Sequence, residues 1–535
     1  MTFLDIACLV AYFAVLGGIG YWSSKRSLDS SKSYFLAGAN IGWIAIGASL
    51  FASNISAEHF IGLAGSGAAG GMAVGQFELL ACFCLLTLGW IFVPLYLRTG
   101  VFTMPEFLEN RFNPQCRTYL SAISLIAYVF TKISVSVYAG ALVLDVVLGW
   151  NMWVGAVVLI VATGIYTVFG GLRAVIYTHL FQAIILIGGG IVLTAIAISR
   201  VGGFNILVQE ATPGFFNLWK GVNHPDFPWT GILFGAPILG IWYWCTDQMI
   251  VQRTLAARNI KEAHRGTLFA GALKLLPIFI LVLPGIAGGI LFRDVAATAP
   301  NEIYATMVNE LLPAGVKGLM VAALMSALMS SLASVFNSSS ALITMDFYKK
   351  YRPDASEKQL VRFGQFATVI LVVVGLVWIP FIGVISNQLF IYLQSVQAYI
   401  SPPIAVVFLL GVSWRRLNGK GALASLIGGF IIGALRFATE TAVKSGWISW
   451  QPLVRFAGIN FLHFAILLAV ICAVIMVLVS LVTAPPPEEK LGIFAKRMEK
   501  RITEEPRAHR INVLLSVLLV VAVLTIWAYF SPLVF

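Results

Sequence analysis

Residues 51–65 place polar and ionisable side chains inside an apolar segment that begins near Trp43 and is long enough to cross a lipid bilayer. The stretch reads Phe-Ala-Ser-Asn-Ile-Ser-Ala-Glu-His-Phe-Ile-Gly-Leu-Ala-Gly. An amide, a carboxylate and an imidazole at that depth are costly unless they face a bundle interior or a cavity. Because small residues weaken helix continuity, backbone carbonyls could also become available there. The pattern predicts a binding site on a broken helix; a polar stripe that joins helices through hydrogen bonds is the alternative.

A second stretch of this kind ends the apolar segment 229–249, where residues 241–248 read Ile-Trp-Tyr-Trp-Cys-Thr-Asp-Gln. It lies five apolar segments after the first, so the two cross the membrane in opposite directions. Paired interruptions at corresponding positions are typical of transporters with inverted repeats and a binding site near the bilayer midplane. The spacing predicts inverted repeats at 43–227 and 228–413.

The composition requires a membrane to stabilise the chain. Of its 535 residues, 59% are hydrophobic and only 11% are charged, and the mean hydropathy is +0.90. A soluble domain carries far more charge. We therefore predict an all-α polytopic membrane protein with about 14 transmembrane helices. They are expected near 3–22, 43–64, 74–97, 118–147, 152–170, 175–199, 229–249, 267–291, 315–345, 363–381, 387–411, 421–438, 456–483 and 511–532.

The basic residues predict an orientation. Most of the 35 Lys and Arg residues fall in alternate loops, starting with 23–42. The positive-inside rule makes these loops cytoplasmic and places both termini outside. The net charge of +12 is thus explained without a nucleic-acid partner. An extra helix and first cytoplasmic loop occupy 1–42, and 414–535 holds three further helices with a basic cytoplasmic linker at 484–510. We expect a multi-pass protein of a plasma membrane, and the compact chain favours a bacterial inner membrane.

The sequence predicts no enzyme, because it has no nucleophile–base constellation, metal motif or phosphate loop. It predicts no organic cofactor either. The six cysteines lack metal-ligand spacing and lie mostly within apolar segments, so we expect free thiols without a disulfide framework. They are Cys8, Cys82, Cys84, Cys116, Cys245 and Cys472.

Ten short phrases carry a resemblance to a known family. They occupy 34–38, 53–56, 103–107, 130–134, 242–248, 251–253, 273–275, 330–334, 344–346 and 402–405. In this order, over about residues 1–480, they resemble the sodium/solute symporter family, and within it the sodium/glucose and sodium/galactose cotransporters. The resemblance implies the LeuT-type five-plus-five inverted repeat, with discontinuous first and sixth core helices. It also implies symport of sodium with a monosaccharide by alternating access.

The resemblance implies a sodium site between the first broken helix and a later helix rich in small residues. Its ligands would be the carbonyl oxygens of Ala52, Ile55 and Ala327 and the hydroxyls of Ser330 and Ser331. Close helix packing is the alternative reason for the small residues. Members that couple two ions carry an Asp where this chain has His179, and favour a hydroxyl where it has Ala333. We therefore expect one sodium per sugar. His179 would be a titratable group near the sodium exit path or a hydrogen-bonded histidine at the inner interface.

The resemblance also implies the sugar site. A hexose needs amides, carboxylates and donors around its edge and an aromatic ring on its face. The implied contacts are Asn54, His59, Glu78, Lys274 and Gln394, with Tyr243 stacking as the inner gate and Leu63, Phe77 and Phe390 covering the outer side. Mutual pairing of Glu78 and Lys274 is the structural alternative.

Several positions depart from other sugar transporters, and Lys132 has no partner assigned from sequence. His59, Gly240 and Phe77 differ from some members and could retune which epimer fits. The alternatives for function are therefore symport of myo-inositol, mannose or another polyol, or a membrane sugar sensor that does not transport.

Overall fold

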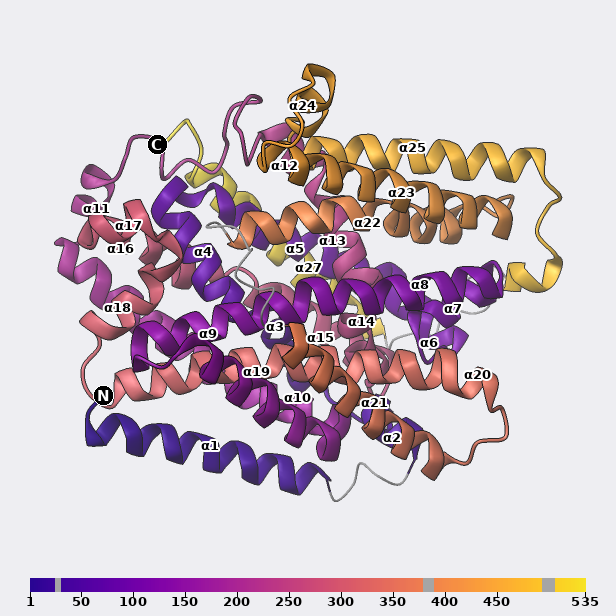
Figure 1. Ribbon diagram of the computed structural model, residues 1–535, viewed down its shortest axis with the longest axis horizontal. Coiled ribbons are helices and arrows are strands. Elements are labelled where there is room, and N and C mark those ends of the chain that lie inside the picture. The colour runs from indigo at the N-terminus through magenta and orange to yellow at the C-terminus, as the bar shows by residue number, and fades with distance from the viewer. Residues whose placement is uncertain (25–29, 379–388, 493–505) are drawn as a thin grey trace.

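The computed structural model describes residues 1–24, 30–378, 389–492 and 506–535. These residues form a bundle of helices that run mostly along the long axis of the molecule (Figure 1). The two chain termini lie at the same end of the bundle. This arrangement is the one expected for a chain that crosses a membrane an even number of times.

The helices before the middle of the chain are α1 Phe3–Ser24, α2 Ser31–Leu36, α3 Trp43–Asn54, α4 Ala57–Gly70, α5 Gln76–Thr87, α6 Val93–Thr99, α7 Met104–Arg111, α8 Pro114–Ala127, α9 Ser134–Leu148, α10 Met152–Val201, α11 Phe204–Glu210, α12 Trp229–Phe234, α13 Ala236–Ile241 and α14 Gln248–Leu255. Those that follow are α15 Ile260–Leu273, α16 Leu283–Leu291, α17 Arg293–Thr298, α18 Ile303–Leu311, α19 Val316–Leu342, α20 Lys349–Tyr351, α21 Glu357–Trp378, α22 Leu389–Ser413, α23 Gly419–Lys444, α24 Gln451–Ala457, α25 Phe461–Val482 and α27 Pro506–Tyr529.

Within the described ranges, 11 helices are long and apolar enough to cross a membrane, fewer than the 14 expected. The three predicted spans without a long helix are 43–64, 152–170 and 229–249. Two of them contain the predicted interruptions and are divided into shorter helices. The third is the first part of α10, before a kink at Gly171, whose φ is +56°. Residues 379–388 of the predicted spans and 493–505 of the predicted linker 484–510 lie outside the described residues.

The first predicted interruption is present between α3 and α4. The helix ends at Asn54 because Ile55 is extended (φ −76°, ψ 95°), and Ser56 is extended as well (φ −110°, ψ −178°). The last turn of α3 thus leaves carbonyl groups without their usual helical partners. This exposes backbone oxygens in the interior of the bundle.

The second predicted interruption is present after a π-helical turn, Trp242–Thr246. Asp247 then becomes extended (φ −74°, ψ 128°), and its carboxylate accepts a hydrogen bond from Met249 N at 2.7 Å, which caps α14. The hydroxyl of Tyr128 donates to the same carboxylate oxygen at 2.5 Å. Asp247 therefore has a structural role at the break.

A third interruption, at residues 274–276, separates α15 from a π-helical turn at Ile278–Val282 and α16. Sequence analysis predicted an unbroken span, 267–291. The turn precedes Pro277, which cannot donate the backbone hydrogen bond of a continuing helix. It brings Lys274 to the level of the first break.

Glycines set the packing of these broken helices in pairs. A Cβ at Gly266 of α15 would lie 2.6 Å from Ile46 Cγ2 of α3, and one at Gly285 of α16 would lie 2.2 Å from Ala64 O of α4. Small residues allow such close approach of helices in membranes. The pairs α3–α15 and α4–α16 are thus each tightly packed.

Helix α19 is buried along almost its whole length and packs on α10, α3 and α1. Asp5 of α1 accepts hydrogen bonds from the backbone of Gly315 at 2.7 Å and Gly318 at 2.9 Å, at the beginning of α19. A carboxylate there satisfies backbone donors and complements the helix dipole. The helix is thereby held in register against the bundle.

Candidate substrate and ion sites

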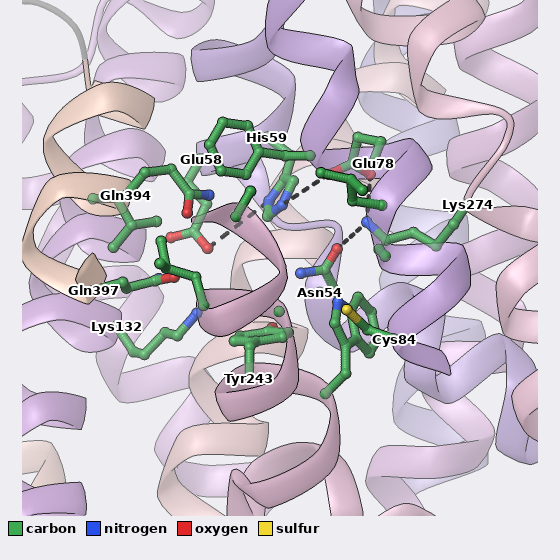
Figure 2. Close-up of a pocket in the computed structure, with 18 residues that line it drawn as sticks. Asn54, Glu58, His59, Glu78, Cys84, Lys132, Tyr243, Lys274, Gln394 and Gln397 are labelled. Atoms are coloured by element: carbon green, nitrogen blue, oxygen red, sulfur yellow. Dashed lines mark hydrogen bonds and ion pairs between the residues drawn. The ribbon is translucent and has the colours of Figure 1, made fainter. Parts of the chain in front are cut away.

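One pocket collects all six residues predicted to contact the sugar: Asn54, His59, Glu78, Tyr243, Lys274 and Gln394 (Figure 2). They come from both sides of the first break, from α5, from the π-helical turn before the second break, from the turn after α15 and from α22. The other lining residues are Glu58, Phe77, Leu80, Ala81, Cys84, Lys132, Ala236, Leu239, Gly240, Trp244, Leu393 and Gln397. The breaks position polar side chains at one level of the bundle.

Lys274, Glu78 and Asn54 form one wall of the pocket. The ammonium group of Lys274 donates to the carboxylate of Glu78 and to the side-chain oxygen of Asn54. Lys274 is 1% exposed and Glu78 3%, so both charges are removed from solvent. Pairing offsets the cost of burying them. The structural alternative and the binding role are compatible here, because the pair also lines the pocket.

His59 lies between this wall and the opposite one (Figure 2). Its Nε2 is 3.8 Å from Glu78 Oε1, and its Nδ1 is 3.8 Å from Glu58 Oε1. Both distances exceed a hydrogen bond. In the described part of the chain, His59 Nδ1 and Glu58 Oε2 are buried without any hydrogen-bond partner. Two polar atoms of the pocket thus remain available to a ligand.

The opposite wall was largely missed by sequence analysis. It contains Glu58, Lys132 and Gln397, next to Gln394 (Figure 2). The Nζ of Lys132 lies 4.4 Å from the centroid of the Tyr243 ring, which gives this lysine the partner that sequence did not assign. Gln397 follows Gln394 by three residues, so both lie on one face of α22. That spacing was a usable signal.

The predicted outer gate is assembled only in part around this pocket. Phe77 lines it, and Phe390 covers the same side, with ring centroids 5.8 Å from those of both Phe77 and His59. Leu63 is fully buried on α4 but is not among the lining residues. Tyr243, the predicted inner gate, is 6% exposed and closes the pocket from the other direction.

The predicted ion site lies where the end of α3 meets α19. The hydroxyl of Ser330 is 3.3 Å from Ala52 O and 2.7 Å from Ala327 O, so three of the five expected ligands are in contact. The Ser331 hydroxyl is buried and has no partner among the described residues. Ile55 is the extended residue at the end of α3. Neutral oxygens of unwound backbone and hydroxyls are the ligands that transporters use for sodium.

His179 contacts this ion site directly. Its Nε2 is 3.3 Å from Ser330 O, and its Nδ1 is 3.1 Å from Ser49 Oγ and 3.2 Å from Ser53 Oγ. A neutral ring with the proton on Nε2 donates to the carbonyl and accepts at Nδ1. Arg253 donates to Ser49 Oγ at 3.1 Å, which leaves the Ser49 proton for Nδ1. The contacts match a neutral, hydrogen-bonded histidine.

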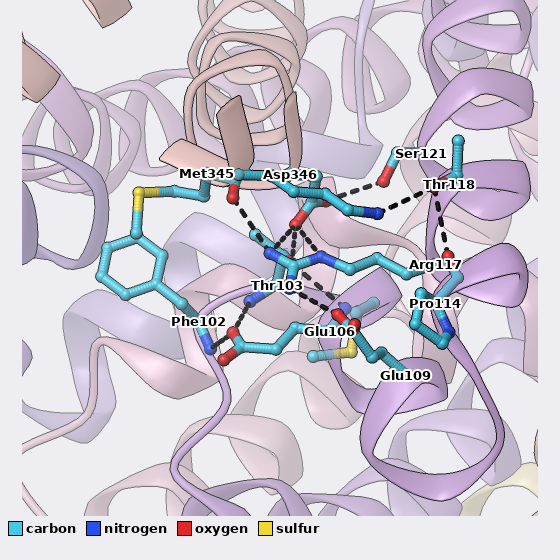
Figure 3. Close-up of polar contacts among 12 residues, drawn as sticks. Phe102, Thr103, Glu106, Glu109, Pro114, Arg117, Thr118, Ser121, Met345 and Asp346 are labelled. Atoms are coloured by element: carbon cyan, nitrogen blue, oxygen red, sulfur yellow. Dashed lines mark hydrogen bonds and ion pairs between the residues drawn. The ribbon is translucent and has the colours of Figure 1, made fainter. Parts of the chain in front are cut away.

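A second buried charge cluster lies beyond the end of α19 (Figure 3). Asp346 Oδ1 accepts from Thr103 Oγ1 at 2.8 Å and from Arg117 at 2.7 and 2.9 Å, and Oδ2 accepts from Ser121 at 2.8 Å. Arg117 also bonds Glu109 at 2.7 Å. Both oxygens of Asp346 are thus fully used. The cluster joins the α7–α8 hairpin to the helix that carries Ser330 and Ser331.

The pocket is suited to binding a small polar ligand. Carboxylates, ammonium groups and amides surround an aromatic ring, and the described residues hold no group of three or more His, Cys, Asp or Glu side chains placed to bind a metal. All six cysteines are free thiols. The arrangement provides hydrogen-bond donors and acceptors around a small polar ligand.

Comparisons with known proteins identify the family. Residues 34–429 match the sodium:solute symporter family. The chain belongs to this family. It is 42% identical to sodium/glucose cotransporter 4 of Mus musculus and 41% identical to sodium/glucose cotransporter 1 of Oryctolagus cuniculus, over 91% of this chain and 77% and 80% of those proteins. The sodium/myo-inositol cotransporter of Canis lupus familiaris is 41% identical, over 91% of this chain and 74% of that protein.

Solved structures agree with the fold of this family member. A Na+-coupled sialic acid symporter in a substrate-bound outward-open state superposes with a TM-score of 0.77 at 21% identity, over 90% of this chain and 99% of that one. The nucleobase-cation-symport-1 family transporter Mhp1 superposes with a TM-score of 0.54 at 14% identity, over 88% and 100%. The fold is therefore LeuT-like. The protein is a multi-pass membrane symporter that couples a small solute to sodium, and it is not an enzyme.

Proposed function

We propose that this symporter carries a neutral monosaccharide resembling glucose or galactose into the cell. The balance of charge in the pocket supports this proposal. Two carboxylates, Glu58 and Glu78, and two ammonium groups, Lys132 and Lys274, line it, so their formal charges cancel. A charged solute would leave one of these buried groups uncompensated, which is costly. A neutral solute with many hydroxyls can hydrogen-bond to all of them.

Each residue of the predicted sugar site then has a role in binding. Asn54, Glu78, Lys274, His59 and Gln394 hydrogen-bond to hydroxyls of the sugar. Tyr243 packs against its ring and separates it from the cytoplasm, and Phe77, Phe390 and Leu63 close the outer side. Rearrangement of these aromatic residues on the two sides provides alternating access.

One sodium ion accompanies each sugar. Its ligands are the carbonyl oxygens of Ala52, Ile55 and Ala327 and the hydroxyls of Ser330 and Ser331. Sodium there stabilises the break between α3 and α4, which favours sugar binding, and linkage requires sugar to tighten sodium equally. A membrane potential of roughly 100 mV contributes about 2.3 kcal/mol, and a tenfold gradient contributes about 1.4 kcal/mol. Together they support roughly several-hundred-fold accumulation. His179 is neutral and hydrogen-bonded, and Ala333 carries no hydroxyl. Neither position therefore supplies a ligand for a second sodium ion.

The proposed architecture follows the repeat boundaries expected from sequence. The inverted repeats are 43–227 and 228–413, preceded by 1–42 and followed by 414–535. The two breaks at α3–α4 and before α14 support this division. We place the protein in the plasma membrane with both termini outside, which fits their position at one end of the bundle.

A polyol is the second candidate substrate. The identity to the sodium/myo-inositol cotransporter of Canis lupus familiaris, 41%, equals that to one of the sodium/glucose cotransporters. A cyclitol is neutral and carries hydroxyls all round its ring, so it also satisfies the pocket. A sensor would bind sugar without transporting it, so only a measurement of sugar flux distinguishes a sensor from a symporter.

Uptake into proteoliposomes tests the function. With an imposed inward sodium gradient, we expect purified protein to accumulate radiolabelled glucose or galactose, and not when potassium replaces sodium. Accumulation of myo-inositol alone would replace the hexose by the cyclitol. Binding of sugar without accumulation would identify a sensor, and uptake that is equal in potassium would exclude coupling to sodium.

A further inference from the structure

Glu58 belongs to the pocket but to none of the contacts implied for the sugar. It lines the wall formed with Lys132, Gln394 and Gln397, across the pocket from Glu78 and Lys274 (Figure 2). Its side chain is buried, with 3% of the residue exposed. It stands at the beginning of α4, directly after the first break, where the positive end of the helix dipole favours a carboxylate.

The two walls differ in how their carboxylates are satisfied. Glu78 accepts a hydrogen bond from Lys274. Glu58 Oε2 has no hydrogen-bond partner among the described residues, and Oε1 is 3.8 Å from the nearest nitrogen of His59, whose Nδ1 is unpartnered as well. A buried polar atom without a partner costs about 1–3 kcal/mol, and more when it is charged. Hydroxyls of a ligand in the pocket would remove that cost.

Lys132 compensates the charge of Glu58 without forming a hydrogen bond with its carboxylate. The ammonium group lies over the Tyr243 ring, 4.4 Å from its centroid. It is close enough to Glu58 to interact with it electrostatically, although no hydrogen bond joins the two among the described contacts. The carboxylate therefore keeps one acceptor oxygen, Oε2, that no described residue occupies. Gln397, 5% exposed, adds an amide at the same wall.

We propose that Glu58, assisted by Gln397, binds hydroxyls on the edge of the substrate ring opposite to the edge held by Glu78 and Lys274. The proposal rests on the proposed function, since it takes the ligand to be a neutral polyhydroxylated ring. It names the feature that the pocket selects, which is hydroxyl groups on both edges of that ring. The ring sits between two carboxylate walls, with His59 on one side and Tyr243 on the other.

Binding of deoxy sugars to variants in which Glu58 or Glu78 is replaced by Gln tests this assignment. The probes are glucose and its 1-, 2-, 3-, 4- and 6-deoxy analogues as competitors of radiolabelled substrate in sodium-driven proteoliposomes. Hydrogen bonds to a charged group are worth about 1.5–3 kcal/mol, so Glu58→Gln should weaken binding of the parent sugar roughly tenfold or more. The analogue that lacks the hydroxyl bound by Glu58 should bind the variant and the wild type about equally. Likewise, the analogue that lacks the hydroxyl bound by Glu78, on the other edge of the ring, should bind Glu78→Gln and the wild type about equally.

Glu440→Gln is the matched control. Glu440 lies on α23, away from the pocket, and accepts hydrogen bonds from Tyr399 and Lys444. Glu440→Gln should leave the binding of glucose and of every deoxy analogue unchanged. The assignment is overturned if Glu58→Gln weakens all analogues equally, if it weakens none, or if it and Glu78→Gln become insensitive to the same hydroxyl. If the wild-type protein binds no sugar of the panel, the proposed function is overturned as well. If the wild type transports sugar and Glu58→Gln has no effect, only the role assigned to Glu58 is overturned.

Discussion

Two buried carboxylates of the same bundle are treated in contrasting ways. Asp346 accepts hydrogen bonds from Thr103, Ser121 and Arg117, so each of its oxygens is used. Glu58 leaves one oxygen without a partner in the described structure. Both residues are almost fully buried, with 2% and 3% exposed. Burial alone therefore does not separate a structural charge from one that awaits a ligand, but hydrogen-bond satisfaction does.

The first and largest contrast is in stability. We expect Asp346→Asn to lower the free energy of unfolding by about 3 kcal/mol, because it weakens the charge-assisted hydrogen bonds that Arg117, Thr103 and Ser121 donate to a buried carboxylate. Glu58→Gln breaks no hydrogen bond of the described structure but removes the charge that compensates Lys132, so it should lower the free energy of unfolding by about 1 kcal/mol, less than Asp346→Asn does. Thermal and denaturant unfolding of both purified variants in detergent measures the difference. Equal destabilisation would mean that Glu58 is structural too.

The second contrast compares two serines of α19. Ser331 has an unpartnered hydroxyl, whereas Ser340 donates to Gly364 O at 2.6 Å. Loss of a hydroxyl ligand should raise the sodium concentration for half-maximal uptake roughly tenfold in Ser331→Ala, by analogy with hydrogen bonds to charged groups. Its unfolding temperature without sodium should not fall. Ser340→Ala should lose about 1 kcal/mol of stability and keep the wild-type sodium dependence. The reverse pattern would contradict the ion site.

The smallest effect concerns a partly buried histidine outside the spans. His224 Nδ1 accepts hydrogen bonds from the backbone of Asp226 at 3.2 Å and Phe227 at 3.0 Å, which requires a neutral nitrogen. Burial lowers the pKa of His224 below its usual value near 6.5, against the opposing effect of Asp226. The neutral form therefore stabilises this loop above pH 6.5, and the contribution is lost as the pH falls through the lowered pKa.

Phe227 carries this effect to the pocket, since its ring centroid is 6.2 Å from that of Phe77. We expect acidification of the outer solution from pH 7.5 to 5.5 to weaken apparent sugar affinity by about twofold, a free-energy change well below that of one pKa unit. Uptake by His224→Gln should lack this component of the pH profile. A variant with the wild-type profile would assign the dependence to another group.

Sequence analysis predicted the helical membrane fold, both discontinuous core helices and the residues that meet in the pocket. These features follow from hydropathy, from polar residues inside apolar segments and from the family phrases. It did not predict the turn at 274–276, because Lys274 and Pro277 lie in a segment whose hydropathy is continuous with its flanks. Three of the 14 expected spans are not single long helices in the described ranges, since hydropathy measures apolar length and not backbone continuity.

The wall of Glu58, Lys132 and Gln397 shows a different limit. Lys132 comes from the π-helical turn before α9 and Gln397 from α22, far from Glu58 in sequence. Their proximity depends on how these helices cross, which no local pattern encodes. The unpartnered state of Glu58 Oε2 is likewise a property of the assembled bundle. Only the three-residue spacing from Gln394 to Gln397 was visible beforehand.

The paired glycine contacts of α3 with α15 and of α4 with α16 have a mechanical consequence. Each pair is closely packed, because a glycine of one helix lies against an atom of the other where a Cβ would not fit. The two pairs are connected through residues 55–56 and 274–276, where the helices are interrupted. We therefore expect the two pairs to move relative to each other at the level of these interruptions, which the hydrogen bond from Lys274 to Asn54 crosses. A solute bound at that level lies between the two pairs and restricts their relative movement. We therefore expect the protein to become more rigid when the site is occupied.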